Sequence, residues 1–167
     1  TRVGILDTLF KRIAPDPEAI AAALPDPAKV AAIVVGHTHS DHALDVPWIA
    51  ARGACKVVGS QSLETLMTIG GLPGRTRVCV GGETLRLTDS ASVTMIRSAH
   101  GLVTLGKGVP FEGEIRATGT LPMKASGYRV GTVFAPNLEL DGKRFLHVGS
   151  ANFDEAHLQG HGCDVLF

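Results

Sequence analysis

The chain has 167 residues, and its 16 basic and 16 acidic side chains give a formal net charge of zero. This balance does not favour nucleic acid or an anionic membrane surface as a partner. No run approaches the roughly 18 consecutive apolar residues of a membrane span. The three cysteines, Cys55, Cys79 and Cys163, form no short-spaced pair, so we expect no disulfide framework and a reducing, cytoplasmic location.

The length fits one compact domain over residues 1–167. Residue 1 is Thr rather than Met, and both ends fall within strand-like segments, RVGIL at 2–6 and CDVLF at 163–167. We therefore expect this domain to lack its N- and C-terminal portions.

Helix starts and apolar runs alternate in the first 70 residues. Asp16 followed by Pro17 predicts a helix that continues through EAIAAAL, and Asp26 and Pro27 repeat the signal. Residues 29–35 read KVAAIVV, which predicts a buried strand. Further elements are predicted as a helix over 46–52, a strand over 55–58 and a helix over 61–69 capped by Ser60.

The second half is predicted to consist mainly of strands. The strand-like runs are RVCV, TLRL and SVTMIRS, then YRVGTVFA and KRFLHV, with a hairpin turn at Asp141 and Gly142 and a last strand of parallel type. Residues 101–126, rich in Gly and Pro, predict a mobile loop that borders the functional site. The order of elements predicts an α/β fold with a mixed sheet and helices outside.

Three histidines and an aspartate follow the strand predicted at 29–35. His37, His39, Asp41 and His42 lie within six residues, directly after Gly36. Neutral imidazole nitrogens and ionised carboxylates are ligands of zinc, and of iron or manganese in its place. The spacing therefore predicts a metal site at the C-terminal edge of this strand.

These residues carry a resemblance to the metallo-β-lactamase superfamily. HTHSDH at 37–42 resembles its first metal-binding motif, and SAHG around His100 resembles the motif of its third histidine. Residues 141–153, DGKRFLHVGSANF, resemble the strand and turn that deliver its metal-bridging aspartate. The resemblance covers nearly the whole chain. It implies a four-layer αβ/βα sandwich and a metal-dependent hydrolase of an ester, lactone, thioester or phosphodiester bond in a small-molecule substrate.

The residue types then predict how the ligands divide. His37, His39 and His100 would hold one ion, with a fourth position left for water. Asp41 and His42 would hold a second ion, or Asp41 would act as the catalytic base that accepts a proton from the water. Zinc is the expected metal, as one or two ions, with iron or manganese as alternatives.

Two departures from the family pattern affect the predicted metal site. Gly149, Ser150 and Ala151 stand where the family has Gly-Asp-Thr, as in a subgroup of bacterial proteins that this segment resembles. A neutral hydroxyl is a poor substitute for a carboxylate, so Ser150 is at best a weak bridging ligand. The family's last histidine is expected beyond Phe167, because His157 and His161 come too early.

Other candidate roles are weaker. His147 is interpreted as a packed core histidine. Ser150 does not lie in a G-x-S-x-G elbow, so a serine hydrolase is not favoured. Two alternatives to the hydrolase stay open: a metal-weakened, non-enzymatic module that binds a ligand or partner, and an iron enzyme with redox chemistry.

Overall fold

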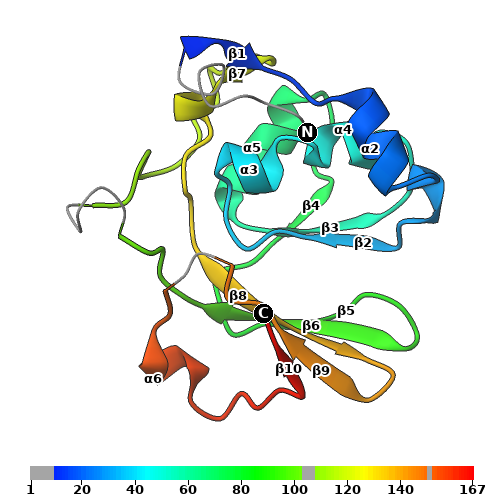
Figure 1. Cartoon of the computed structure of the whole chain (residues 1–167), viewed down its shortest axis with the longest axis vertical. Coiled ribbons are helices and arrows are strands. Elements are labelled where there is room, and N and C mark those ends of the chain that lie inside the picture. The colour runs from blue at the N-terminus through cyan, green and yellow to red at the C-terminus, as the bar shows by residue number, and fades with distance from the viewer. Residues whose placement is uncertain (1–9, 103–107, 150–151) are drawn as a thin grey trace.

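Two β-sheets lie face to face with helices outside them (Figure 1). The computed structural model describes residues 10–102, 108–149 and 152–167. The first sheet is parallel, in the order β2–β3–β4. Its strands and the helices of this half are β2 (Ala32–Val34), β3 (Lys56–Gly59), β4 (Thr76–Val78), α2 (Pro17–Ala23), α3 (Ser40–Ala43), α4 (Val46–Ala50) and α5 (Gln61–Ile69).

The second sheet has the order β10–β9–β8–β6–β5 and is antiparallel except for the pair β10 and β9. Its elements are β5 (Thr84–Arg86), β6 (Ala91–Arg97), β8 (Phe134–Leu140), β9 (Lys143–Leu146), α6 (Glu155–Leu158) and β10 (Val165–Leu166). A separate ribbon pairs β1 (Arg12–Ile13) with β7 (Met123–Lys124). Two short 3-10 helices cover Pro27–Lys29 and Ala125–Gly127.

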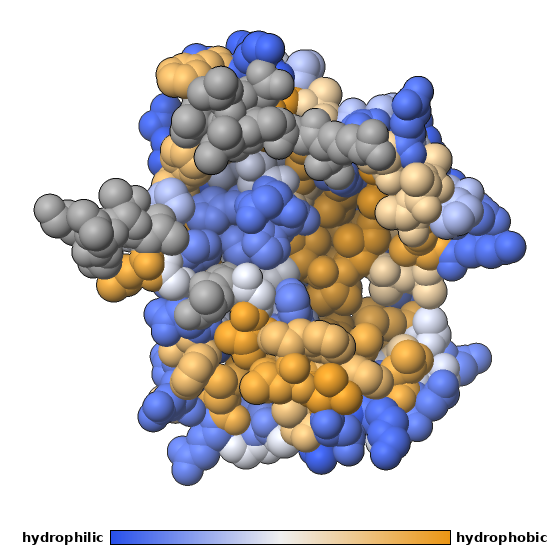
Figure 2. Space-filling model, viewed as in Figure 1, coloured by the Kyte–Doolittle hydropathy of each residue, from blue (hydrophilic) through white to orange (hydrophobic). Residues whose placement is uncertain are grey.

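The side chains of β3 show how one strand serves two cores. Successive side chains of a strand point to opposite faces. Val57 packs under the helices with Leu63 and Leu66 of α5, whereas Val58 packs between the sheets with Met95. Figure 2 shows apolar residues in the space between the two sheets. The first sheet is therefore buried on both faces, as parallel sheets usually are.

A third apolar cluster lies on the far side of the second sheet. Ile96, Ala135 and Leu146 form it, and Leu158 of α6 packs against them. The layers therefore run from helices through two sheets to α6, which confirms the predicted α/β class. In the described residues the fourth layer of the expected αβ/βα sandwich consists of the short helix α6.

Local sequence signals account for several elements as predicted. The Asp16 side chain accepts hydrogen bonds from the backbone amides of Glu18 and Ala19, both at 3.1 Å, at the start of α2. At the β8–β9 hairpin, Asp141 and Gly142 adopt φ values of 47° and 76°. Such left-handed conformations at both central positions suit the twist of a two-residue hairpin.

One predicted strand was misplaced. YRVGTVFA was expected to be extended over 128–135, but β8 begins only at Phe134. Tyr128 and Val130 are buried, and the Val130 carbonyl accepts a hydrogen bond from the Thr38 amide at 3.0 Å. The apolar residues before β8 therefore pack beneath the histidine motif instead of extending the sheet. The predicted strand at 2–6 lies outside the described residues.

No helix in the described ranges is long and apolar enough to span a bilayer.

Glu64 on α5 links its helix to the following loop, and we expect Glu64→Gln to destabilise the protein. Its carboxylate accepts hydrogen bonds from the amides of Gly74 at 2.6 Å and Thr76 at 3.0 Å. The substituted NH2 group would face one of these donors. We expect a loss of about 1–3 kcal/mol in the free energy of unfolding at pH 7, measured by urea denaturation.

The same contacts of Glu64 predict that the free energy of unfolding depends on pH. Burial raises the pKa of Glu64, but hydrogen bonds from Gly74 and Thr76 lower it more, so its pKa in the folded protein lies below the ordinary 4.5. A lowered folded-state pKa stabilises the protein above 4.5, and this stabilisation is lost as the pH falls through the folded value. The difference between wild type and Glu64→Gln should therefore shrink at acidic pH. Glu139→Gln, on an exposed residue of β8, is the control, and an equal loss in both variants would contradict the role of Glu64.

Candidate metal centre

The histidine motif begins where β2 meets the second sheet. After β2, the Gly36 carbonyl accepts a hydrogen bond from the Phe134 amide at 2.7 Å. A Cβ at Gly36 would lie 3.0 Å from the Phe134 carbonyl oxygen, so a larger residue would push the two segments apart. Gly36 thus lets the start of β8 lie against the end of β2, and His37 follows at the edge shared by both sheets.

The motif continues into a helix, which the sequence analysis did not predict. His39 is the N-cap of α3, and α3 starts at Ser40 inside the motif. His42 is consequently a helical residue, and its ring lies 3.9 Å from that of His37, centroid to centroid. The motif is therefore a strand end followed by one helical turn rather than a polar loop alone.

His37, His39 and His100 converge from two distant parts of the chain. His100 follows β6, in the second sheet. The ligand nitrogens of the three residues lie within 4.8 Å of one another. Their ring centroids are 4.9, 5.0 and 4.8 Å apart in pairs, with the ring planes nearly perpendicular. The structure therefore brings together the three histidines predicted to hold one ion.

Backbone carbonyls orient two of these rings. Nε2 of His39 lies 2.8 Å from the Pro110 carbonyl oxygen, and Nδ1 of His100 lies 2.7 Å from the Gly101 carbonyl oxygen. A carbonyl can only accept, so each of these nitrogens carries the proton. This leaves Nδ1 of His39 and Nε2 of His100 with the free lone pairs that a metal ion requires.

The histidines of the motif are held in the neutral form. Burial lowers the pKa of His37 to about 3, with further lowering by His42, His39 and His100. Burial is also the main cause of the lowered pKa of His39 and of His42. Neutral imidazole is the form that binds metal, so the donor set fits a divalent cation at neutral pH.

Asp41 and His42 lie beside this cluster rather than in it. Oδ2 of Asp41 is 3.4 Å from Nε2 of His42, and the Asp41 side chain is 77% exposed. A small cavity of about 80 Å³ lies next to them, lined by His37, His42 and His147 among others. His42 of α3 and His147, which follows β9, thus face one space, which is the arrangement that a second ion would need.

The interpretation of His147 as a packed core residue is wrong. Its side chain is exposed at the end of β9 and lowers the pKa of His42 by charge repulsion. The sequence offered one unused signal for it, because His147 lies in segment 141–153, which was compared with the strand and turn of a metal-bridging aspartate.

The remaining predicted site residues divide into two cases. Ser150, the predicted weak bridging ligand, lies outside the described residues. His157 pairs with Asp154 at 2.8 Å on α6, apart from the three-histidine cluster.

The loop predicted to border the site does so in its described part. Besides the Pro110 contact, the ring of Phe111 lies 6.3 Å from that of His39. Residues 103–107 of this loop are not described, and its mobility stays a prediction.

No protein-family model and no curated protein matches the sequence. Among solved structures, the chain is similar to Igni18, a metallo hydrolase from the archaeon Ignicoccus hospitalis, at 15% identity and a TM-score of 0.42, over 68% of this chain and 39% of that one. It is also similar to a HARLDQ-motif mutant of a metallo-β-lactamase from Cronobacter sakazakii, at 15% identity and a TM-score of 0.46, over 78% and 45%. The chain spans less than half the length of either protein.

Proposed function

We propose that the protein is a metal-dependent hydrolase that uses a metal-activated water on an ester, lactone, thioester or phosphodiester bond. The observation that carries the proposal is the convergence of His37, His39 and His100, whose ligand nitrogens lie within 4.8 Å of one another. The buried, neutral rings of His37 and His39 fit a divalent ion, for which zinc is the first candidate and iron or manganese the alternatives.

His37, His39 and His100 would hold a divalent ion and leave a position free for water, as in catalytic rather than structural sites. When bound, the ion would supply an activated water at neutral pH and would polarise the bond to be cleaved. The Pro110 carbonyl holds the His39 ring in place for this role. Asp41 is exposed at the rim of the cluster, where its carboxylate can accept and release protons during turnover.

The alternative is a non-enzymatic module that binds a ligand or partner, with a weakened metal centre. It is favoured by Gly149-Ser150-Ala151, because the family's bridging carboxylate is absent there. The same substitution leads us to propose one tightly held ion in preference to two, since no bridging carboxylate offsets the repulsion between two cations. His42 and His147 would contribute to any second, weaker site.

Metal content and hydrolysis, measured on one preparation of the full-length protein, separate the two functions. We expect about one equivalent of zinc, iron or manganese by mass spectrometry. We also expect cleavage of at least one of p-nitrophenyl acetate, a thioester, a lactone and bis(p-nitrophenyl) phosphate, lost on chelation and restored by the metal. A folded, stable protein without metal and without activity on any of these would overturn the proposal and support the binding module.

A further inference from the structure

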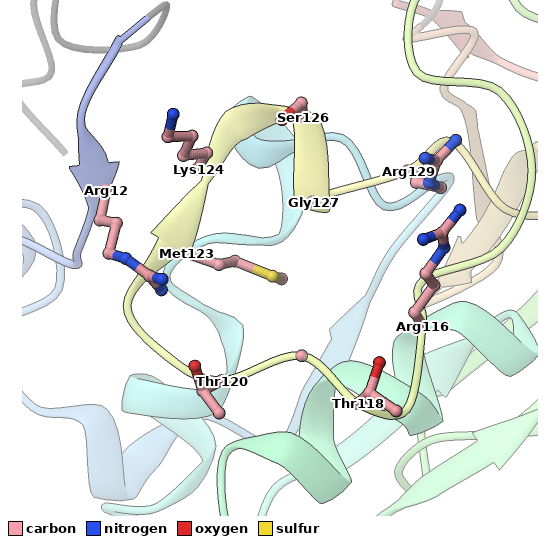
Figure 3. A pocket seen from close by; sticks show the side chains of 10 residues that line it. Arg12, Arg116, Thr118, Thr120, Met123, Lys124, Ser126, Gly127 and Arg129 are labelled. Carbon is pink, nitrogen blue, oxygen red and sulfur yellow. The ribbon is translucent and has the colours of Figure 1, made fainter.

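A second pocket, separate from the histidine cluster, lies beside the β1–β7 ribbon and has a volume of about 360 Å³. This falls within the range of about 300–1,000 Å³ that is usual for pockets that hold small molecules. Figure 3 shows Arg116 and Arg129 on one side of the opening and Arg12 and Lys124 on the other, with the side chain of Met123 between them.

The pocket gathers positive charge without compensation. Four of the chain's 16 basic residues line it, although the chain as a whole is neutral. None of its described lining residues is acidic. Arg12 donates to the Pro122 carbonyl at 2.8 Å and Arg129 to the Glu112 carbonyl at 2.7 Å. These bonds hold the two guanidinium groups in place without neutralising them.

The other two cations have no carboxylate or carbonyl partner in the described part of the chain. Within the described residues, no hydrogen bond or ion pair involves the side chain of Arg116 or of Lys124. Like charges repel one another, and a bound anion would offset this repulsion. Arg12, Arg116 and Lys124 are exposed, so an anion from solution can reach them. The hydroxyl groups of Thr118, Thr120 and Ser126 add hydrogen-bond donors to the same lining.

Local structure builds this arrangement. Arg12 and Lys124 are paired across the antiparallel ribbon, which places them next to each other. Met123 is buried, and its sulfur lies 2.8 Å from where a Cβ would stand at Gly127. A larger residue at Gly127 would therefore displace Met123 from the floor of the pocket. Met123 thus forms a packed floor, and the exposed side chains of Arg12, Arg116 and Lys124 stand around it.

Backbone contacts connect the pocket to the metal centre. The hydroxyl of Thr38, between His37 and His39, donates to the carbonyl of Arg129 at 2.5 Å. Arg129 in turn contacts the carbonyl of Glu112, two residues after Pro110, whose carbonyl holds His39. The segment from Pro110 to Arg129 therefore forms both the loop over the histidines and one wall of this pocket, called the basic pocket below.

We propose that this pocket binds the phosphate group of a small phosphorylated molecule. A phosphate monoester carries nearly two negative charges at neutral pH and three strong acceptor oxygens. It therefore matches several guanidinium and ammonium groups with hydroxyl donors better than a carboxylate does, which has one charge and two oxygens. The assignment of this molecule as the substrate of the metal centre rests on the proposed function, whereas the binding itself does not.

Nucleic acid is the less suitable occupant. Binding a polyphosphate chain requires cations along a track, and usually aromatic side chains for base stacking. Here the cations surround one pocket, and none of the described residues that line it is aromatic. The geometry therefore points to a single phosphate group.

Calorimetric titration of the full-length protein with inorganic phosphate and with phenyl phosphate tests the proposal. The test variant is Arg116→Gln with Lys124→Gln, and the matched control is Arg86→Gln with Lys143→Gln, which removes two exposed charges from the second sheet. We expect the test variant to bind both probes at least about tenfold more weakly, and the control to change affinity by less than about twofold. Thermal melting checks that both variants are folded.

A third variant distinguishes phosphate binding in the basic pocket from phosphate binding at the metal centre, because phosphate also binds metal ions. The variant His39→Ala should lose metal but bind phenyl phosphate as the wild type does. Loss of phosphate binding in His39→Ala, or equal binding by the Arg116/Lys124 variant and wild type, would place the anion at the metal centre and overturn the proposal. Tight binding of a single-stranded oligonucleotide without binding of phenyl phosphate would overturn it as well. If no bond class is hydrolysed but phosphate binding follows these expectations, only the assignment as substrate is lost.

Discussion

His39→Ala is expected to remove the metal ion and the hydrolytic activity together. His39 supplies one of three converging nitrogens, and its Nε2–H is fixed by the Pro110 carbonyl. Loss of an outer-shell partner alone typically weakens metal binding by 10–100-fold, so loss of a ligand should cost more than about a hundredfold. Metal content after dialysis and turnover at fixed added metal measure the two effects.

The matched control for His39→Ala is His161→Ala. His161 is exposed and does not belong to the three-histidine cluster, so this variant should keep both metal and activity. Full metal retention in His39→Ala would contradict the site assigned here. Loss of metal in His161→Ala would show that a late histidine completes the centre after all.

The histidine motif could be predicted as a candidate metal site because its residues are close in sequence. Three imidazoles and a carboxylate within residues 37–42, after an apolar run, restrict the chemistry to very few options. His100 was harder to assign, since a single histidine after a strand carries little information by itself. Its assignment depended on the family resemblance, and the structure confirms its approach to His37 and His39.

The contacts that orient the site could not be predicted. The Pro110 carbonyl reaches His39 across 71 positions of sequence, and it is a backbone group that every residue possesses. The approach of His147 to His42 likewise depends on how the two sheets pack, which residue patterns within a single strand do not encode. The four cations of the basic pocket come from β1, β7 and the loops around them, so no local charge run indicated them.

The misplaced strand has a related cause. Tyr128 and Val130 show the alternation of a half-buried strand. A pattern of period two does not say whether the hydrogen-bond partner of the segment is another strand or a loop. In the fold, Thr38 takes the hydrogen bond that a neighbouring strand would have made with Val130. The segment that supports the metal centre therefore has the composition of a strand while acting as a loop, and local pattern alone could not separate the two.

Asp41→Asn is expected to lower turnover strongly while leaving the metal ion in place. Asp41 is not one of the three clustered ligands, and its exposed carboxylate lies 3.4 Å from Nε2 of His42 at the rim of the site. Asparagine keeps the shape of the side chain but cannot accept a proton at neutral pH. Loss of a positioned general base typically costs 10²–10⁴-fold, so we expect kcat to fall by about that factor with little change in KM.

The control is Asp89→Asn, which removes an exposed carboxylate of the second half of the chain that pairs with Arg86 at the surface. It should leave kcat and metal content unchanged.

The metal content and the kcat of Asp41→Asn decide between the two predicted roles of Asp41, which are catalytic base and metal ligand. If metal is retained and kcat falls, Asp41 acts on protons; if about one equivalent of metal is lost together with activity, Asp41 is a ligand. The second result would mean that the exposed carboxylate turns inward when the ion binds, next to His42, which lines the small cavity together with His147.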